Sequence, residues 1–165
     1  MKLGWSSYCF KKAMDAGEMS PLDVIQWIAD NGGEHMEIAS YGLSLIDRLE
    51  LADEIREKAM NLGLELSNYC MAANLIMDTP KDREAELKRV KEHIDLTHRL
   101  GIKRMRCDVV PRFLKPEEML YAFYEKHFQT LVEGCRELAD YAANYGITVA
   151  VENHQYCLNA SERVQ

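Results

Sequence analysis

Short apolar runs alternate with longer amphipathic stretches along the whole chain. The apolar runs have the length and the β-branched content of buried strands, and they cover residues 2–7, 35–40, 64–69, 104–110 and 148–153. Between them, apolar side chains recur every three or four residues, which predicts helices over about 20–31, 45–62, 82–100 and 124–142. The pattern therefore predicts four strand–helix units, a fifth strand, and the start of one more helix within 159–165.

The first long helix shows how the sequence marks helix ends. Ser20 is a favoured N-cap residue, and Pro21 suits the first helical position because its missing N–H is not needed there. Gly32 and Gly33 follow the last apolar position, where a left-handed residue ends many helices. The later helices are expected to end in the same way, at Gly63, Gly101 and Gly146.

This regular alternation predicts a parallel sheet with right-handed crossovers. Both an open doubly wound sheet and a (β/α)8 barrel accommodate such units. No G-x-G-x-x-G motif follows the first strand, which disfavours a dinucleotide-binding sheet. Polar residues stand at the C-terminal end of every strand, where barrel enzymes carry their chemistry. We therefore expect an α/β protein of the TIM-barrel type, with a single domain over 1–165 that supplies about five strands of an incomplete barrel.

The end of the fifth strand holds the main candidate residues. Glu152 and His154 point to the same side because side chains alternate along a strand, so both are expected at the barrel mouth. A carboxylate in that place can bind a divalent metal or take a proton from a carbon acid. The structural alternative stays open: Glu152 caps the next helix or forms an ion pair with Arg106.

The other strands offer further candidate substrate contacts, each with a structural alternative. Glu37 can contact a substrate or only form an ion pair at its strand end. Trp5 can stack under a sugar ring or belong to the core. Arg106 and Asp108 share one face of the fourth strand, so they can face a substrate or pair with each other. Asn68 ends the third strand and completes the set.

Composition narrows the class of protein. A net charge of −7 disfavours a nucleic-acid partner, which needs clustered Lys and Arg, but it permits a small phosphorylated substrate. No apolar run is long enough to cross a membrane, and no signal peptide precedes the first strand. The 5 cysteines form no C-x-x-C pair, which indicates reduced, mostly buried thiols in a cytoplasmic protein.

Five segments together carry a family resemblance: MKLGWSSYCF, GEMSPLDVIQWIADNGGEHMEI, LGLELSNY, RMRCDVV and VAVENHQYCLNASERVQ. In this order they resemble the xylose isomerase-like TIM-barrel family, and within it the bacterial sugar phosphate isomerases and epimerases. The resemblance covers the whole chain. Its most specific element is VENH, residues 151–154.

The resemblance implies a barrel with a divalent metal (Mn, Mg, Zn or Co) at its mouth. Glu152 maps onto the first metal ligand, and the remaining ligands are expected beyond Gln165. The implied activity is isomerisation or epimerisation of a small sugar or sugar phosphate by proton transfer through an enediolate, with Glu152 as the catalytic carboxylate. Such a metal stabilises developing negative charge while a carboxylate acts as base. Whether the protein is a homo-oligomer is left open.

The same superfamily includes other functions. An endonuclease is disfavoured because the places that hold its zinc-binding histidines read 68–70 NYC and 106–108 RCD here. A lyase that dehydrates a cyclic polyol or a keto acid stays open, as does a non-catalytic truncated barrel that acts as a binding module. The expected barrel is truncated after the fifth strand, so the 165 residues alone are expected to lack catalysis.

Overall fold

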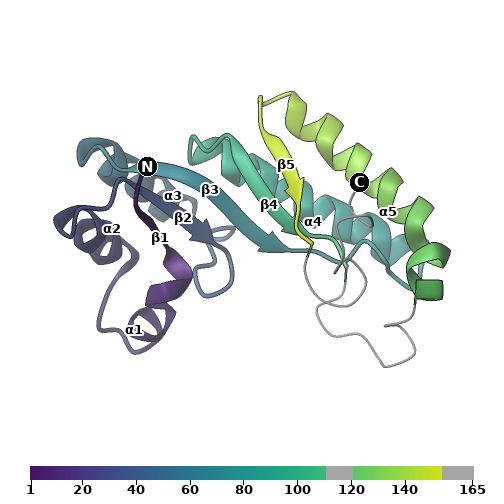
Figure 1. The fold of residues 1–165 in the computed structure, drawn as a ribbon, viewed down its shortest axis with the longest axis horizontal. Coiled ribbons are helices and arrows are strands. Elements are labelled where there is room, and N and C mark those ends of the chain that lie inside the picture. Colours follow the sequence, from purple (N-terminus) through teal and green to yellow (C-terminus); the bar gives the residue numbers. More distant parts are fainter. Residues whose placement is uncertain (111–120, 154–165) are drawn as a thin grey trace. The chain divides into compact units, whose positions relative to one another are not determined.

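The computed structural model describes residues 1–110 and 121–153. Its strands form one sheet in sequence order: β1 (Gly4–Ser6), β2 (His35–Ala39), β3 (Glu65–Ala72), β4 (Arg104–Asp108) and β5 (Thr148–Val151). The helices are η1 (Ser7–Phe10), α1 (Lys11–Asp15), α2 (Pro21–Asp30), α3 (Leu49–Asn61), α4 (Pro80–Arg99) and α5 (Tyr121–Ala143) (Figure 1). The parallel strand–helix alternation predicted from the sequence is therefore confirmed.

Some element boundaries differ from the predictions. The short turns η1 and α1 directly follow β1, and they are too short to produce a periodic apolar pattern. Strand β3 continues to Ala72 because Tyr69 and Met71 are both buried on one face, which extends the alternation. The helix expected within 159–165 lies outside the described residues.

The chain forms two compact units. The first comprises Met1–Met71 and His93–Met105, and the second comprises Ala72–Glu92 and Arg106–Gln165. Each has its own buried apolar side chains, and each is described below by itself.

In the first unit, β2 separates a buried face from a polar one. Met36 and Ile38 are fully buried, whereas the alternate residues His35 and Glu37 remain partly accessible. Two-residue alternation of this kind places one side of the strand against the apolar core. Glu37 therefore lies on the face opposite the core, where its side chain is accessible to a ligand.

Helix α2 begins and ends as predicted. The Ser20 side chain accepts a hydrogen bond from the backbone N–H of Asp23, and the Asp23 carboxylate accepts one from the Ser20 backbone, which makes a capping box. At the other end Gly32 has φ +78°, and Gly33 packs so closely that an added Cβ would lie 2.3 Å from the Ile28 Cγ2 atom. Both glycines are thus required where they stand, one for its backbone angle and one for its small size.

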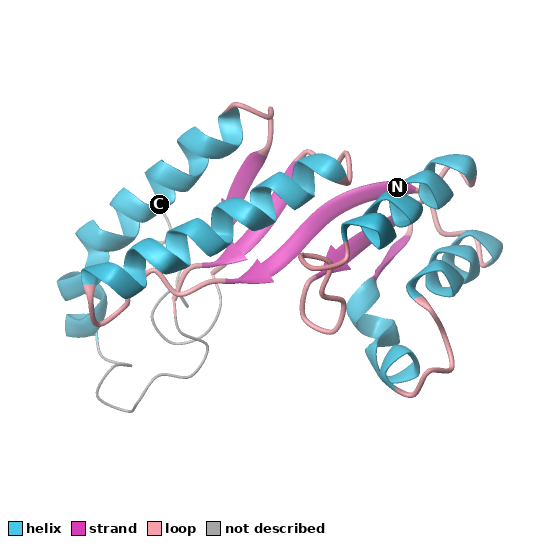
Figure 2. Ribbon diagram, turned by 180° about the vertical axis from the view of Figure 1, so that it is seen from behind, coloured by secondary structure: helices cyan, strands magenta, loops and turns pink. Residues whose placement is uncertain are grey.

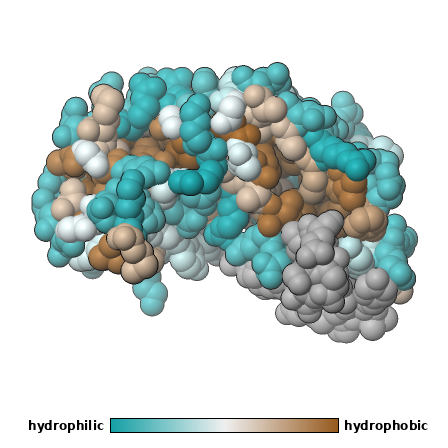
Figure 3. Space-filling model, turned by 45° about the horizontal axis from the view of Figure 1, so that its top comes forward, coloured by the Kyte–Doolittle hydropathy of each residue, from teal (hydrophilic) through white to brown (hydrophobic). Residues whose placement is uncertain are grey.

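In the second unit, the part of α4 before Glu92 packs beside α5 (Figure 2). Leu87 and Val90 on α4 and Leu131 and Leu138 on α5 are buried, in agreement with the predicted apolar stripes. Gly134 of α5 packs closely against the segment between β3 and α4, because an added Cβ would lie 2.9 Å from Leu75 Cδ1. On the face shown in Figure 3, apolar side chains are visible between hydrophilic ones.

A buried hydrogen-bonded group joins β3 to α4 inside the first unit. The Tyr69 hydroxyl lies 2.7 Å from His93 Nδ1, and the Thr97 hydroxyl donates to the His93 carbonyl at 2.7 Å. Tyr69 is 0% exposed and Thr97 is 0% exposed. A buried polar atom loses its hydrogen bonds to water, and this costs free energy unless another group replaces them. The hydrogen bonds between these side chains make that replacement.

Substitution Tyr69→Phe tests this packing. It removes the hydroxyl while keeping the ring, so we expect a loss of about 1–2 kcal/mol in the free energy of unfolding, measured by urea titration. The control is Tyr8→Phe, whose side chain is exposed and should change stability by less than about 0.5 kcal/mol. Equal stabilities of the two variants would show that the Tyr69–His93 contact contributes nothing to the fold.

Candidate active site

Two pairs of polar side chains occupy the strands on the faces away from the core. The Glu37–Asn68 pair belongs to the first unit, and the Arg106–Glu152 pair belongs to the second. All four residues were predicted as site residues from the sequence. The structure brings each pair into direct contact.

A β-bulge creates the Glu37–Asn68 pair. Met36 pairs with Leu66, but the next residue along β2, Glu37, pairs with Asn68, so β3 contains one extra residue, Ser67. The Asn68 side-chain amide donates to Glu37 Oε2 at 2.7 Å. The extra residue therefore turns Asn68 toward the face that carries Glu37, and the carboxylate keeps a fixed, hydrogen-bonded orientation.

The bulged residue itself is hydrogen-bonded. The Ser67 hydroxyl lies 2.9 Å from His35 Nδ1 and also donates to the Met36 carbonyl at 3.3 Å. Both partners come from β2, so the bulge is held by the neighbouring strand. This fixes the register on which the Glu37–Asn68 pair depends.

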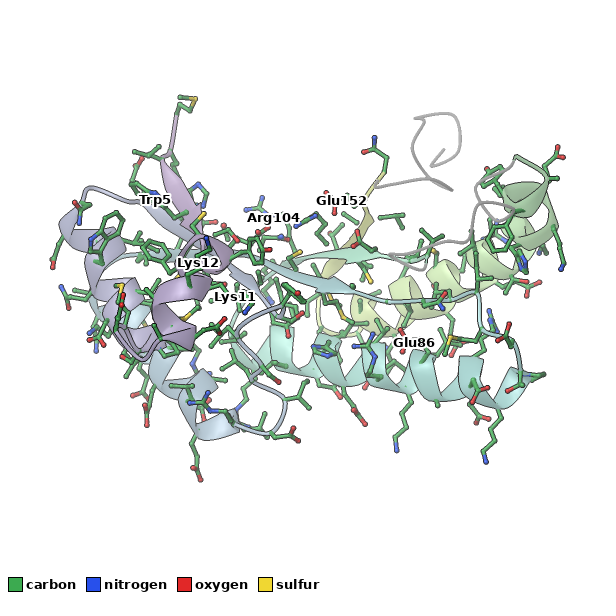
Figure 4. All side chains as sticks on the ribbon, turned by 90° about the horizontal axis from the view of Figure 1, so that it is seen from below. Trp5, Lys11, Lys12, Glu86, Arg104 and Glu152 are labelled. Atoms are coloured by element: carbon green, nitrogen blue, oxygen red, sulfur yellow. The ribbon has the colours of Figure 1, made fainter. Side chains whose placement is uncertain are left out.

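The Arg106–Glu152 pair joins β4 to the residue that follows β5. The Arg106 guanidinium donates to Glu152 Oε2, and the Glu152 backbone N–H donates to the Cys107 carbonyl at 3.2 Å. Glu152 is labelled in Figure 4. The side chains are 34% and 29% exposed, so this ion pair is partly shielded from water. The sequence left an ion pair with Arg106 as the alternative to a metal-binding or catalytic role for Glu152, and the structure contains this ion pair. The metal-binding and catalytic roles stay predictions.

Asp108 and Cys107 lie on opposite faces of β4. Asp108 follows Arg106 on the partly accessible face, whereas Cys107 is 0% exposed. The Asp108 backbone carbonyl accepts the N–H of Ala73 at 2.8 Å. Burial raises the pKa of the Cys107 thiol to about 12, and the neighbouring Asp108 carboxylate adds to the effect. Cys107 is thus an inert core thiol.

Trp5 on β1 is partly accessible and packs against α2. Its ring, labelled in Figure 4, meets the Trp27 ring of α2 edge-on, and the centroids are 5.7 Å apart. This contact does not decide between the two alternatives from the sequence, a core ring and a ring that stacks under a sugar, so the substrate contact of Trp5 stays a prediction. His154, the other candidate at the end of β5, lies outside the described residues.

Sequence reasoning missed an exposed aromatic pair that follows β1 and β2. The rings of Tyr8 and Tyr41 are 5.7 Å apart, and the two residues are 50% and 58% exposed. The Lys11 ammonium lies 5.8 Å from the centre of the Tyr41 ring, a cation–π contact. Neither Tyr belongs to a periodic pattern, so the only signal in the sequence was their position just after apolar strands.

The described residues do not by themselves form a metal centre. They contain no group of three or more His, Cys, Asp or Glu side chains close enough to hold one ion. Glu152 supplies one suitable carboxylate, and that carboxylate is bound to Arg106. Within the part of the chain that the structure describes, Glu152 is therefore a single candidate ligand, and a divalent ion would need further ligands besides it.

The fold and the polar strand ends define a class: parallel α/β proteins with the chemistry at the C-terminal ends of the strands. A family model described as "Xylose isomerase-like TIM barrel" matches residues 25–163. The chain therefore belongs to the xylose isomerase-like TIM-barrel family, as the sequence motifs indicated, and the described sheet and helices are part of such a barrel. Comparison with curated protein sequences gave no significant match.

Solved structures with the same fold have low sequence identity to this chain. A D-psicose 3-epimerase in the presence of D-fructose is 18% identical, with a TM-score of 0.76 over 97% of this chain and 55% of that one. The IOLI protein with a bound zinc atom is 20% identical, with a TM-score of 0.72 over 99% and 56%. The probable 3-DHS dehydratase AsbF from Bacillus anthracis is 15% identical, with a TM-score of 0.72 over 94% and 53%. The chain spans about half the length of these proteins.

The described helices include none that is long and apolar enough to cross a membrane.

Thiol reactivity tests the assignment of Cys107 as an inert core residue. At pH 8 in iodoacetamide, Cys9 should be alkylated first because it is exposed, whereas Cys107 should react only after denaturation, since its thiolate is scarce and buried. Peptide mass spectrometry at successive times measures both rates. Alkylation of Cys107 in the native protein at the rate of Cys9 would contradict the assignment.

Proposed function

We propose that this chain carries the base of a sugar isomerase or epimerase, one that acts on a small sugar or sugar phosphate. The observation that supports the proposal best is the Arg106–Glu152 pair, a carboxylate and a cation in contact where β5 ends. Carbon-acid chemistry needs this combination, because a base must remove a proton while a positive group stabilises the oxygen that becomes negative.

In the proposed reaction, Glu152 takes the proton from the carbon next to the sugar carbonyl. The C–H electron pair forms the carbon–carbon double bond of an enediolate, and the carbonyl oxygen becomes negatively charged. Arg106 donates hydrogen bonds to that oxygen as its charge develops. Return of the proton to the neighbouring carbon, with the hydroxyl proton moving to the original carbonyl oxygen, gives an isomer. Delivery of a proton from a second acid to the opposite face of the same carbon gives an epimer.

The remaining predicted contacts are proposed to bind hydroxyl groups of the sugar. Glu37 and Asn68 present a carboxylate and an amide that are already oriented by each other, and Asp108 presents a second carboxylate. A contact by His154 is part of the same proposal. The exposed Tyr8 and Tyr41 rings offer a flat apolar surface for a sugar ring.

A divalent metal is part of the proposal, with Glu152 as one of its ligands. The zinc atom bound to the structurally similar IOLI protein supports this. Such an ion, when bound, would stabilise negative charge on the sugar oxygens. We further propose a cytoplasmic protein with a small carbohydrate as substrate and no nucleic-acid partner, in keeping with its net charge of −7.

Substitution Glu152→Gln tests the base. The protein as encoded is incubated with a panel of keto sugars and their phosphates in heavy water, in the presence of divalent metal ions. We expect proton–deuterium exchange next to the carbonyl, followed by NMR, and a loss of at least roughly a hundredfold in the variant because an amide cannot accept the proton. Glu54→Gln, an exposed residue of α3, is the control.

The products separate the alternatives. Exchange without loss of water supports an isomerase or epimerase, whereas loss of water identifies a lyase. Exchange that survives in Glu152→Gln would remove Glu152 from the role of base. Absence of exchange with every substrate, together with tight sugar binding, would favour a non-catalytic binding module.

Substitution Tyr41→Ala tests the aromatic surface. Loss of the ring should raise KM for the active sugar roughly three- to tenfold with kcat little changed, because stacking contributes about 0.5–1.5 kcal/mol to binding. Tyr41→Phe keeps the ring and should retain the original KM. An unchanged KM in both variants would show that the sugar does not contact this surface.

A further inference from the structure

Strand β3 and the residues after it continue past the point where their pairing with β2 ends. The last paired residues are Ala39 and Cys70, and the Ser40 N–H donates to the Cys70 carbonyl at 2.8 Å. Backbone groups of alternate residues point to the same side of a strand, so the Ala72 carbonyl and the Asn74 N–H face this side as well. They need partners other than β2, because a shielded backbone group without a hydrogen bond costs free energy.

Two side chains of α4 take the place of a neighbouring strand there. The Asn74 N–H donates to Glu86 Oε1 at 2.8 Å, and a terminal nitrogen of Arg89 donates to the Ala72 carbonyl at 2.7 Å. The helix thus supplies one acceptor and one donor to successive backbone groups, as a paired strand does. We call Glu86 and Arg89 the α4 clasp.

An ion pair within the α4 clasp fixes its geometry. Arg89 Nε donates to Glu86 Oε2, and a terminal nitrogen of Arg89 donates to Glu86 Oε1, both at 2.8 Å. Two parallel hydrogen bonds of this kind orient the guanidinium and the carboxylate relative to each other. The Glu86 side chain, labelled in Figure 4, is only 12% exposed, so its charge depends on these donors in place of water.

The other side of the clasped segment holds the end of β4. The Ala73 N–H donates to the Asp108 carbonyl at 2.8 Å, and the Leu75 N–H donates to the Val109 carbonyl at 2.9 Å. Residues 72–75 therefore lie between the α4 clasp and the end of β4, all within the second unit. A clasp that fixes this segment also fixes the backbone of Asp108.

We propose that Glu86 and Arg89 are positioning residues, which act through residues 72–75 to hold the Asp108 carboxylate where it binds a sugar hydroxyl. The inference rests on the proposed function, because it assumes that Asp108 contacts the sugar. Both oxygens of Glu86 are engaged by Asn74 and Arg89, so Glu86 acts through the backbone and not on the sugar. Loss of the α4 clasp should therefore change sugar binding more than proton transfer.

Amide hydrogen exchange, followed by NMR, tests the α4 clasp without any sugar. In Glu86→Ala the Asn74 amide loses its acceptor and its neighbours lose their support, so the amides of Ala73, Asn74 and Leu75 should exchange at least roughly tenfold faster. Glu86→Gln keeps an oxygen that can accept from Asn74, and its rates should stay within about threefold of the original. The matched control is Glu84→Ala, an exposed glutamate of the same helix, which should leave these rates unchanged.

Two results of the exchange experiment would overturn the proposal. One is an unchanged rate at the Ala73 and Leu75 amides in Glu86→Ala, because these amides report the hold on the end of β4. The other is an equal rise at amides throughout the protein, because it would report a loss of overall stability.

Steady-state kinetics with the active sugar tests the consequence for binding. We expect KM to rise roughly three- to tenfold in Glu86→Ala with kcat within about twofold, and Glu86→Gln to restore most of the original KM. An unchanged KM, or a lower kcat alone, would contradict the positioning role. If the original protein turns over no sugar, the isomerase proposal fails, and the exchange rates of Ala73 and Leu75 still decide whether the α4 clasp positions Asp108.

Discussion

The pleat of the parallel strands governs the rest of this structure. Successive side chains point to opposite faces, so a strand that buries Met36 and Ile38 must present Glu37 on the other side. The same rule places Cys107 in the core and Arg106 and Asp108 opposite it. The strands therefore pack against the core with one face and carry polar side chains on the other. A change that shifts the residues of a strand alters both faces at once.

Much of the fold could be predicted because its signals are local. The N-cap Ser20, the helix-ending Gly32 and the apolar stripes of α4 and α5 depend on neighbours in the sequence, and the structure confirms them. The short elements η1 and α1 could not be predicted, since a single helical turn is too short for a period to show.

The sequence predicted which residues belong to the candidate site, but it predicted less well which of them are in contact. Alternation placed Arg106 and Glu152 on strand faces, but whether Glu152 met Arg106 or another group depended on how strands far apart in sequence were paired. The bulge at Ser67 carries no clear mark in the sequence, because serine is neither a glycine nor a break in an apolar run. Contacts between strands are fixed by the whole sheet, and one strand alone cannot reveal them.

The bulge at Ser67 also bears on how this segment can vary among related proteins. Ser67 is the unpaired residue, and the pairs on either side of it, Met36 with Leu66 and Glu37 with Asn68, are those of a regular ladder. A β3 without Ser67 could therefore keep Asn68 beside Glu37 and Tyr69 in the core. Relatives should accept a gap of one residue at this position more readily than elsewhere in the strand, where a gap would move every later side chain to the other face.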